Sequence, residues 1–175
     1  MSEINKKTKI EELAIIVCDA LLKKDINTVL TGGAVVSIYS NNEYVSSDLD
    51  FISYGDDKKI KEVMEELGFT IKEGRYYTHK NTNLFVEFPP PPLAIGNTPI
   101  KKVAEIKKDG KVLRLLTPTQ CVMDRLAAYF YWNDLQCLEQ AVQVAQKHPI
   151  DLNEIRKWAK EDDVLDKFNI FRKRI

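Results

Sequence analysis

The chain has 175 residues, 44% of them apolar, which is enough for the core of one domain or of one domain with a helical appendage. Its 26 basic and 26 acidic side chains cancel, which excludes a global charge that would attract nucleic acid or an anionic membrane; an RNA partner would need a local basic patch. No apolar run reaches the length of a transmembrane helix, and the polar start "MSEINKKTKIEEL" has no apolar signal-peptide core, so we expect a cytoplasmic protein with no membrane partner.

The first two thirds of the chain alternate between helical and strand-like patterns. Apolar residues follow a helical period in "IEELAIIVCDALLKKD", and "NTVLTGG" is typical of a short buried strand closed by glycines. "AVVSIYSNN" predicts a short helix, "SDLDFIS" alternates with period two, and "DDKKIKEVMEELGF" predicts an amphipathic helix that Gly68 ends. Strand-like runs follow in "FTIKE", "RYYTHK" and "NLFVEF", and "KDGK" predicts a hairpin turn inside "KKVAEIKKDGKVLRLLT".

The last third of the chain is helical in pattern. Thr117 is expected to cap a helix that begins at Pro118. "CVMDRLAAYFYW", "LQCLEQAVQVAQKH" and "DLNEIRKWAKEDD" predict helices, with a further short helix at the C-terminus. We therefore expect an α+β fold, with a mixed-sheet core and flanking helices over residues 1–116 and a helical region packed on it over residues 117–175.

The three cysteines, Cys18, Cys121 and Cys137, are widely spaced among apolar residues, which predicts buried thiols in a reducing compartment. With two histidines and no C-x-x-C motif, the sequence argues against a zinc site.

Two aspartates stand in the apolar run "SDLDFIS" and need an explanation, because a desolvated carboxylate is costly without a partner. In a strand, Asp48 and Asp50 point to the same face with Cβ atoms roughly 6–7 Å apart, which suits hard cations such as Mg²⁺. Glu87 in "LFVEF" is a third candidate carboxylate, from another strand. The alternative for Glu87 is a salt bridge on an edge strand.

The glycines Gly32 and Gly33 stand where a predicted strand ends and a helix begins. Backbone N–H groups at such a place can receive phosphate oxygens without side-chain obstruction. Alone, the pair is also typical of an ordinary turn; together with the later D-x-D and Glu87 it favours a phosphate and metal site.

Leu30, Gly32, Gly33 and the later "SDLDF" resemble the signature of the nucleotidyltransferase superfamily that shares the DNA polymerase beta fold. The resemblance covers residues 27–88 and is nearest to the small prokaryotic branch that includes antibiotic nucleotidyltransferases and abortive-infection toxins. It implies that Asp48, Asp50 and Glu87 are the catalytic and metal-binding residues.

The same resemblance implies a Mg²⁺- or Mn²⁺-dependent enzyme that uses an NTP such as ATP. It places Gly32, Gly33 and Ser47 at the phosphates. It also implies that Arg125 and Asp134, on the C-terminal helices, face the nucleotide. The alternative for these two residues is that both are solvated or that they form a structural ion pair with each other. The departure is at "EYVSSDLD", where Ser46 and Ser47 stand in place of a basic residue that such relatives often carry.

The sequence therefore predicts transfer of a nucleoside monophosphate to a hydroxyl of RNA such as tRNA, of a protein or of a small molecule, in a toxin–antitoxin or other setting. The alternatives are a binding or antitoxin module of the same fold with little catalysis, and a structural domain whose aspartates cap a loop. The nucleotide, the acceptor and any oligomer stay open.

Two further stretches bear on the cleft. "PPPP" after Glu87 predicts a rigid loop at its rim. Arg75, Tyr76, Tyr77 and His79 fit either contact with RNA or the solvated face of a hairpin.

Overall fold

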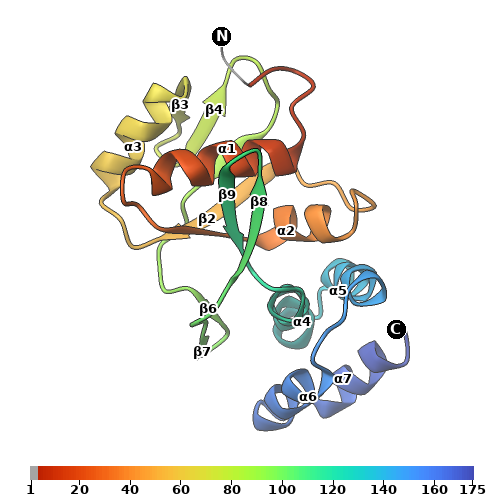
Figure 1. Cartoon of the computed structure of the whole chain (residues 1–175). Coiled ribbons are helices and arrows are strands. Elements are labelled where there is room, and N and C mark those ends of the chain that lie inside the picture. The colour runs from red at the N-terminus through yellow and green to blue at the C-terminus, as the bar shows by residue number, and fades with distance from the viewer. Residues whose placement is uncertain (1–3) are drawn as a thin grey trace.

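The computed structural model of the protein describes residues 4–175, so the first three residues of the predicted core lie outside the described residues. Its α+β architecture confirms the predicted fold class (Figure 1). The helices are α1 (Ile10–Leu22), α2 (Gly32–Tyr39), α3 (Asp57–Glu66), α4 (Pro118–Trp132), α5 (Leu135–Lys147), α6 (Leu152–Glu161) and α7 (Leu165–Arg172). The strands are β1 (Thr28–Thr31), β2 (Asp48–Ser53), β3 (Phe69–Lys72), β4 (Tyr76–His79), β5 (Phe85–Glu87), β6 (Ala94–Ile95), β7 (Thr98–Pro99), β8 (Ala104–Lys108) and β9 (Lys111–Leu115).

Seven strands form one mixed sheet in the order β3-β4-β5-β2-β1-β9-β8. The pairs β1–β9 and β2–β5 are parallel and the other pairs are antiparallel. Helix α1 crosses in front of the sheet with α3 beside it, and the helices from α4 to α7 lie together at one end, next to α2 (Figure 1). This topology places β2, which carries both predicted aspartates, between β1 and β5 near the centre of the sheet.

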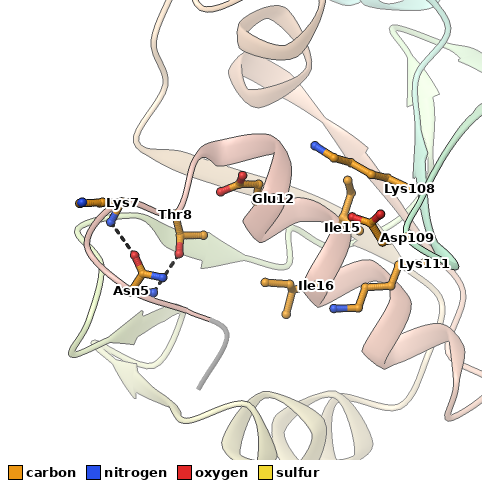
Figure 2. A pocket seen from close by; sticks show the side chains of 9 residues that line it. All are labelled: Asn5, Lys7, Thr8, Glu12, Ile15, Ile16, Lys108, Asp109 and Lys111. Carbon is orange, nitrogen blue, oxygen red and sulfur yellow. Dashed lines mark hydrogen bonds between the residues drawn. The ribbon is translucent and has the colours of Figure 1, made fainter. Parts of the chain in front are cut away.

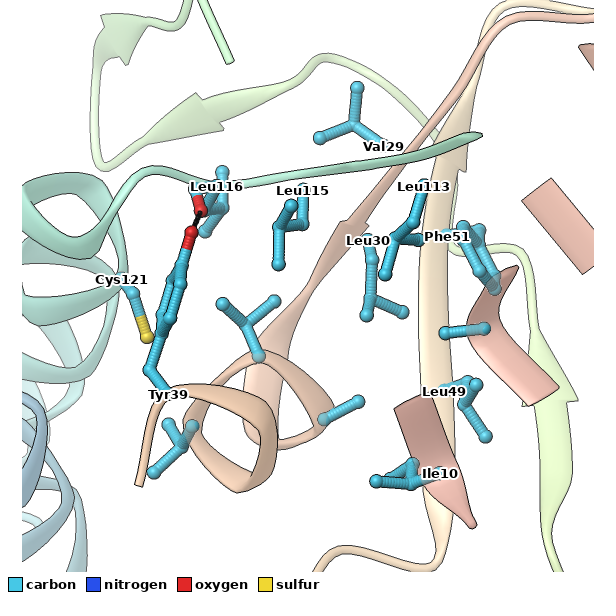
Figure 3. Packing of buried hydrophobic residues seen from close by; sticks show 14 of the residues in the cluster. Ile10, Val29, Leu30, Tyr39, Leu49, Phe51, Leu113, Leu115, Leu116 and Cys121 are labelled. Atoms are coloured by element: carbon cyan, nitrogen blue, oxygen red, sulfur yellow. Dashed lines mark hydrogen bonds between the residues drawn. The ribbon is translucent and has the colours of Figure 1, made fainter. Parts of the chain in front are cut away.

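The main core lies between the sheet and its helices. Leu30, Leu49 and Phe51 have no exposed surface (Figure 3), and in β2 every second residue is buried. Figure 3 also shows Tyr39 of α2, whose hydroxyl donates a hydrogen bond of 2.7 Å to the carbonyl oxygen of Leu116. This bond ties α2 to the segment that leads into α4.

Local sequence signals set the helix ends. The hydroxyl of Thr117 accepts a hydrogen bond from the Gln120 amide, and Pro118 is the first residue of α4, as predicted. Asp56 caps α3 in the same way, and Gly68 follows that helix with a φ of +90°, which favours glycine. All three cysteines are buried and free, as predicted.

The prolines after Glu87 lie in a segment without helix or strand, as predicted, and residues 94–99 that follow add regular structure that was not predicted. These residues form the small hairpin β6–β7, which packs against α4. Strands of two residues leave too little periodicity to be recognised from the sequence. Among residues 4–175, no helix combines the length and the apolar character needed to cross a membrane.

Candidate active site

Asp48, Asp50 and Glu87, which we name the carboxylate cluster, lie on one face of the sheet. In the β2–β5 pair the partner of Asp50 is Glu87, and the partner of Asp48 is Phe85. Paired residues on neighbouring strands point to the same face, and all three carboxylates are half-buried while Leu49 and Val86 between them are fully buried. The chain therefore brings together the three acidic residues singled out from the sequence, on the face opposite the main core.

Asp50 is electrostatically the most perturbed member of the cluster. Burial, together with the negative charges of Asp48 and Glu87, raises its pKa from about 3.8 to about 6, while Arg125 opposes the shift. Repulsion among neighbouring carboxylates is relieved by a bound cation, and strongly shifted groups gather at functional sites. The cluster thus has the electrostatics of a cation site.

Asp48 is held by the serine that precedes it by two positions. The Ser46 hydroxyl is 2.6 Å from Asp48 Oδ1, and Ser46 is itself buried, with its amide bound to Ser37 Oγ. Ser47, the residue predicted to contact phosphate, has an exposed side chain. Of the two adjacent serines, Ser46 is therefore the one that orients a carboxylate.

Replacing Ser46 with alanine is expected to raise the Mg²⁺ concentration needed for half-maximal activity by about tenfold, because groups that orient a metal ligand typically contribute that much. The measurement is a Mg²⁺ titration of activity, with Ser47→Ala as the matched control. Ser47→Ala leaves the Mg²⁺ dependence unchanged and alters at most the KM for NTP. An unchanged Mg²⁺ dependence in Ser46→Ala would contradict this role.

Glu87 lies on an interior strand and is paired with a cation. Arg75 Nη2 is 3.6 Å from Glu87 Oε2, and the arginine side chain is 66% exposed. The salt bridge predicted as the alternative is thus present, although β5 lies between β4 and β2 and is no edge strand. An ion pair with such an exposed partner contributes little stability and can be broken easily.

The donor chemistry of the cluster fits a hard divalent cation, since it offers only carboxylate oxygens. As the side chains of residues 4–175 stand, no three acidic, histidine or cysteine groups are close enough together to hold a metal ion. In the structure Asp48 contacts Ser46, and Glu87 contacts Arg75. A cation at the cluster would therefore compete with Arg75 for Glu87.

Gly32 and Gly33 form the start of α2, beside Asp50. Gly32 has a φ of +71°, and a Cβ built there would lie 2.8 Å from Asp50 Oδ2. At Gly33 a Cβ would lie 3.2 Å from the Ser46 hydroxyl and from the Tyr44 ring. The first amides of a helix have no intrahelical partner, so this turn offers N–H groups directly next to the carboxylate cluster.

Arg125 lies near Asp50 but pairs with its own neighbour. Arg125 Nη2 is 2.6 Å from Asp124 Oδ2, and both side chains are mostly buried. Burial alone would lower the pKa of Arg125, yet Asp124 raises it above its ordinary value, so the guanidinium stays charged. Asp134 instead caps α5 by accepting a 3.0 Å hydrogen bond from the Cys137 amide, which lowers its pKa.

Asp124 is a residue that the sequence reasoning missed. Its charge contributes to the raised pKa of Asp50, which places a fourth carboxylate near the cluster. The sequence feature that could have identified Asp124 is the charged Asp-Arg pair inside the otherwise apolar helix "CVMDRLAAYF".

Two cavities flank the carboxylate cluster. The first, the Gly32 pocket of about 250 Å³, is lined by Thr31, Gly32, Asp50, Ile52, Pro89, Pro92, Leu93, Ala94, Ile100, Leu116, Asp124 and Arg125. The second, the Tyr76 groove of about 440 Å³, is lined by Asp48, Lys72, Glu73, Tyr76, Thr78, Phe85 and Glu87. The proline segment after Glu87 forms part of the wall of the Gly32 pocket, at the rim position predicted for it.

A separate cavity of about 470 Å³ lies between the N-terminal turn, α1 and the β8–β9 hairpin (Figure 2). Ile15 and Ile16 lie at its lining with Lys108 and Lys111, and Glu12 there accepts a hydrogen bond from the Lys9 amide as part of the α1 cap. None of the carboxylate cluster lines this cavity, so we assign the candidate site to the other two.

The fold of the chain is similar to that of a known protein. A nucleotidyltransferase-like antigenic protein from Paracoccidioides brasiliensis has a TM-score of 0.55 at 13% identity, with 95% of this chain and 94% of that chain covered. The fold is nucleotidyltransferase-like.

Two structures of the antibiotic-resistance factor ANT(2″)-Ia are also similar. The complex with adenylyl-2″-tobramycin has a TM-score of 0.49 at 13% identity, covering 94% of this chain and 97% of that one. The solution structure has a TM-score of 0.48 at 14% identity, covering 94% and 92%. No family model matches the sequence, and no curated protein matches it.

Proposed function

We propose that the protein is a metal-dependent nucleotidyltransferase that transfers a nucleoside monophosphate from an NTP to a hydroxyl acceptor. The observation that carries the proposal is the carboxylate cluster on one sheet face beside a glycine turn, with the pKa of Asp50 raised to about 6. The nucleotidyltransferase-like fold supports it. In this proposal residues 1–116 form the catalytic core, and residues 117–175 contribute Arg125 to the nucleotide side.

In the proposed mechanism Gly32 and Gly33 receive phosphate oxygens through their amides, and the exposed Ser47 hydroxyl adds a further donor. Arg125 supplies a positive charge to the same pocket, held in place by Asp124. Asp134 acts at the start of α5, where it fixes the helix that faces Arg125. These residues would position the triphosphate, and positioning together with charge neutralisation provides most of the rate enhancement in such transfers.

Asp48, Asp50 and Glu87 would hold Mg²⁺ or Mn²⁺, which supplies the positive charge that stabilises both the attacking and the leaving oxygen. The acceptor oxygen bonds to the α-phosphorus, the bond between the α-phosphorus and the bridging oxygen breaks, and pyrophosphate leaves. The hydroxyl proton passes to a carboxylate of the cluster. Ser46 keeps Asp48 oriented throughout, and Glu87 takes part once it has released Arg75.

The test incubates the purified protein with each labelled NTP, Mg²⁺ and a cell extract, and follows which RNA, protein or small-molecule fraction takes the label. Asp48→Asn is expected to reduce labelling by at least about a hundredfold, because it removes a charged ligand. Asp109→Asn, an exposed change in the β8–β9 turn, is the matched control and keeps full labelling. Full transfer by Asp48→Asn would contradict the proposal, and NTP binding without transfer by the unaltered protein would favour the binding or antitoxin module.

A further inference from the structure

The Tyr76 groove lies on the opposite side of the carboxylate cluster from the Gly32 pocket. Asp48 and Glu87 line the groove, whereas Asp50 lines the pocket, so the cluster is shared between two cavities. A transfer between two substrates needs both reacting groups at the carboxylates. With the triphosphate at Gly32, the groove is the place left for the acceptor.

Two aromatic side chains of the sheet line this groove. Thr78 pairs with Phe85, and Phe85 pairs with Asp48, so these side chains form one row across the face. Tyr76 lies beside this row, and its ring meets the Phe85 ring edge-on, with centroids 5.5 Å apart. Both rings are only half-buried, so part of their surface is exposed next to the carboxylates, while Arg75 covers one face of the Tyr76 ring.

Two cationic side chains, Arg75 and Lys72, lie at the groove beside its acidic residues. Arg75 lies over the Tyr76 ring at 4.7 Å and is paired with Glu87 in the structure. When Glu87 turns to a cation, Arg75 loses that partner but keeps its place over the ring. Lys72, the strand partner of Tyr76, is the second cation at the groove. Glu73 is the one acidic residue of the described lining that does not belong to the carboxylate cluster.

From these contacts we propose that the acceptor is a nucleotide, free or at the end of an RNA strand, bound in the Tyr76 groove; the inference rests on the proposed function. Its base would stack against Tyr76, its phosphate would meet Lys72 and Arg75, and a ribose hydroxyl would reach Asp48 and Glu87. Aromatic stacking with neighbouring basic groups is the usual way to hold an unpaired nucleotide. A volume of about 440 Å³ is adequate for one nucleotide.

The ribose hydroxyl oxygen forms a bond to the α-phosphorus of the NTP, and the bond from that phosphorus to the bridging oxygen breaks. Pyrophosphate leaves, and the hydroxyl proton goes to the carboxylate cluster. A polycationic acceptor would instead be drawn to Asp48, Glu73 and Glu87, so it is the competing occupant that the experiment must distinguish.

The experiment measures binding of three probes in Mg²⁺ buffer with a saturating non-hydrolysable NTP analogue, which keeps the probes out of the Gly32 pocket: AMP, a seven-nucleotide RNA, and the polycationic aminoglycoside kanamycin. Tyr76→Ala is expected to weaken the binding of AMP or the RNA by about tenfold, since stacking on one ring contributes that much, while Tyr76→Phe keeps it. Lys72→Ala is expected to weaken binding and its salt dependence, with Lys58→Ala on the exposed face of α3 as the matched control. RNA bound well above AMP identifies a strand end as the source, and equal binding identifies a free nucleotide.

Two results would overturn the inference: nucleotide binding that Tyr76→Ala leaves unchanged, or kanamycin bound in preference to both nucleotide probes. A parallel transfer assay separates the two proposals. Tyr76-dependent binding without any transfer contradicts the proposed function, whereas transfer with an unchanged acceptor KM in Tyr76→Ala contradicts the inference alone.

Discussion

Replacing Asp50 with asparagine is expected to reduce nucleotide transfer by at least about a thousandfold, since a charged metal ligand contributes several kcal/mol to such a reaction. The same change is expected to stabilise the fold at neutral pH. The Asp50 carboxylate is ionised there at an energetic cost, because burial and the charges of Asp48 and Glu87 raise its pKa to about 6. The proposed activity would therefore depend on a residue that destabilises the folded protein.

The stability gained by Asp50→Asn depends on pH. Because the pKa of Asp50 in the folded chain lies above its ordinary value of 3.8, the folded state binds more protons than the unfolded state between pH 3.8 and about 6, and stability falls as pH rises through that interval. An amide at this position carries no charge and removes the penalty. Asp50→Asn therefore gains on the order of 1–2 kcal/mol at pH 7.5, after discounting for partial exposure, and nothing below about pH 4.

Thermal unfolding at the two pH values measures this effect. A gain of that size corresponds to a rise in Tm of roughly 3–6 °C for a chain of this length. Addition of Mg²⁺ or Mn²⁺ at pH 7.5 is expected to raise the Tm of the unaltered protein and not that of Asp50→Asn. Asp109→Asn, exposed in the β8–β9 turn, is expected to change neither activity nor Tm. A Tm of Asp50→Asn below that of the unaltered protein at pH 7.5 would contradict the electrostatic argument.

The parts of the site that follow from local periodicity could be predicted from the sequence. Alternation in "SDLDF" and "LFVEF" gives the face of each strand, and that is enough to anticipate that Asp48, Asp50 and Glu87 share one. Gly68 and Thr117 set helix ends through their own backbone and hydroxyl chemistry, which does not depend on distant residues.

The parts that depend on strand register and side-chain partners could not be predicted in this way. The sequence distance of twelve residues between Arg75 and Glu87 gives no hint of their ion pair, which exists because β4 runs antiparallel to β5. The choice of Ser46 over Ser47 as the partner of Asp48 depends on which serine points into the protein. Asp124 comes near the cluster only because α4 packs against α2 and the β6–β7 hairpin. The strand register thus decides that Asp50 lines the Gly32 pocket while Asp48 and Glu87 line the Tyr76 groove.

Gly32 is the position where the smallest added group is expected to have a large effect. Gly32→Ala places a Cβ 2.8 Å from Asp50 Oδ2, closer than any normal contact, and forces alanine to adopt a φ of +71°. The backbone term alone costs about 1–2 kcal/mol for a residue other than glycine. The collision adds displacement of the Asp50 carboxylate, and misplacing a reacting group by about 1 Å can lower activity about a hundredfold.

Gly110→Ala separates these two effects. Gly110 has nearly the same φ, +75°, but nothing lies within 4 Å of a Cβ built there. Both variants are therefore expected to lose a similar amount of stability from the backbone, measured by urea unfolding, while only Gly32→Ala loses transfer activity and Mg²⁺ affinity. If the two variants kept equal activity, Asp50 would tolerate displacement, and the close approach of the glycine turn to the carboxylate would have no catalytic purpose. If only Gly32→Ala loses activity, the activity requires that no side chain at position 32 displaces the Asp50 carboxylate.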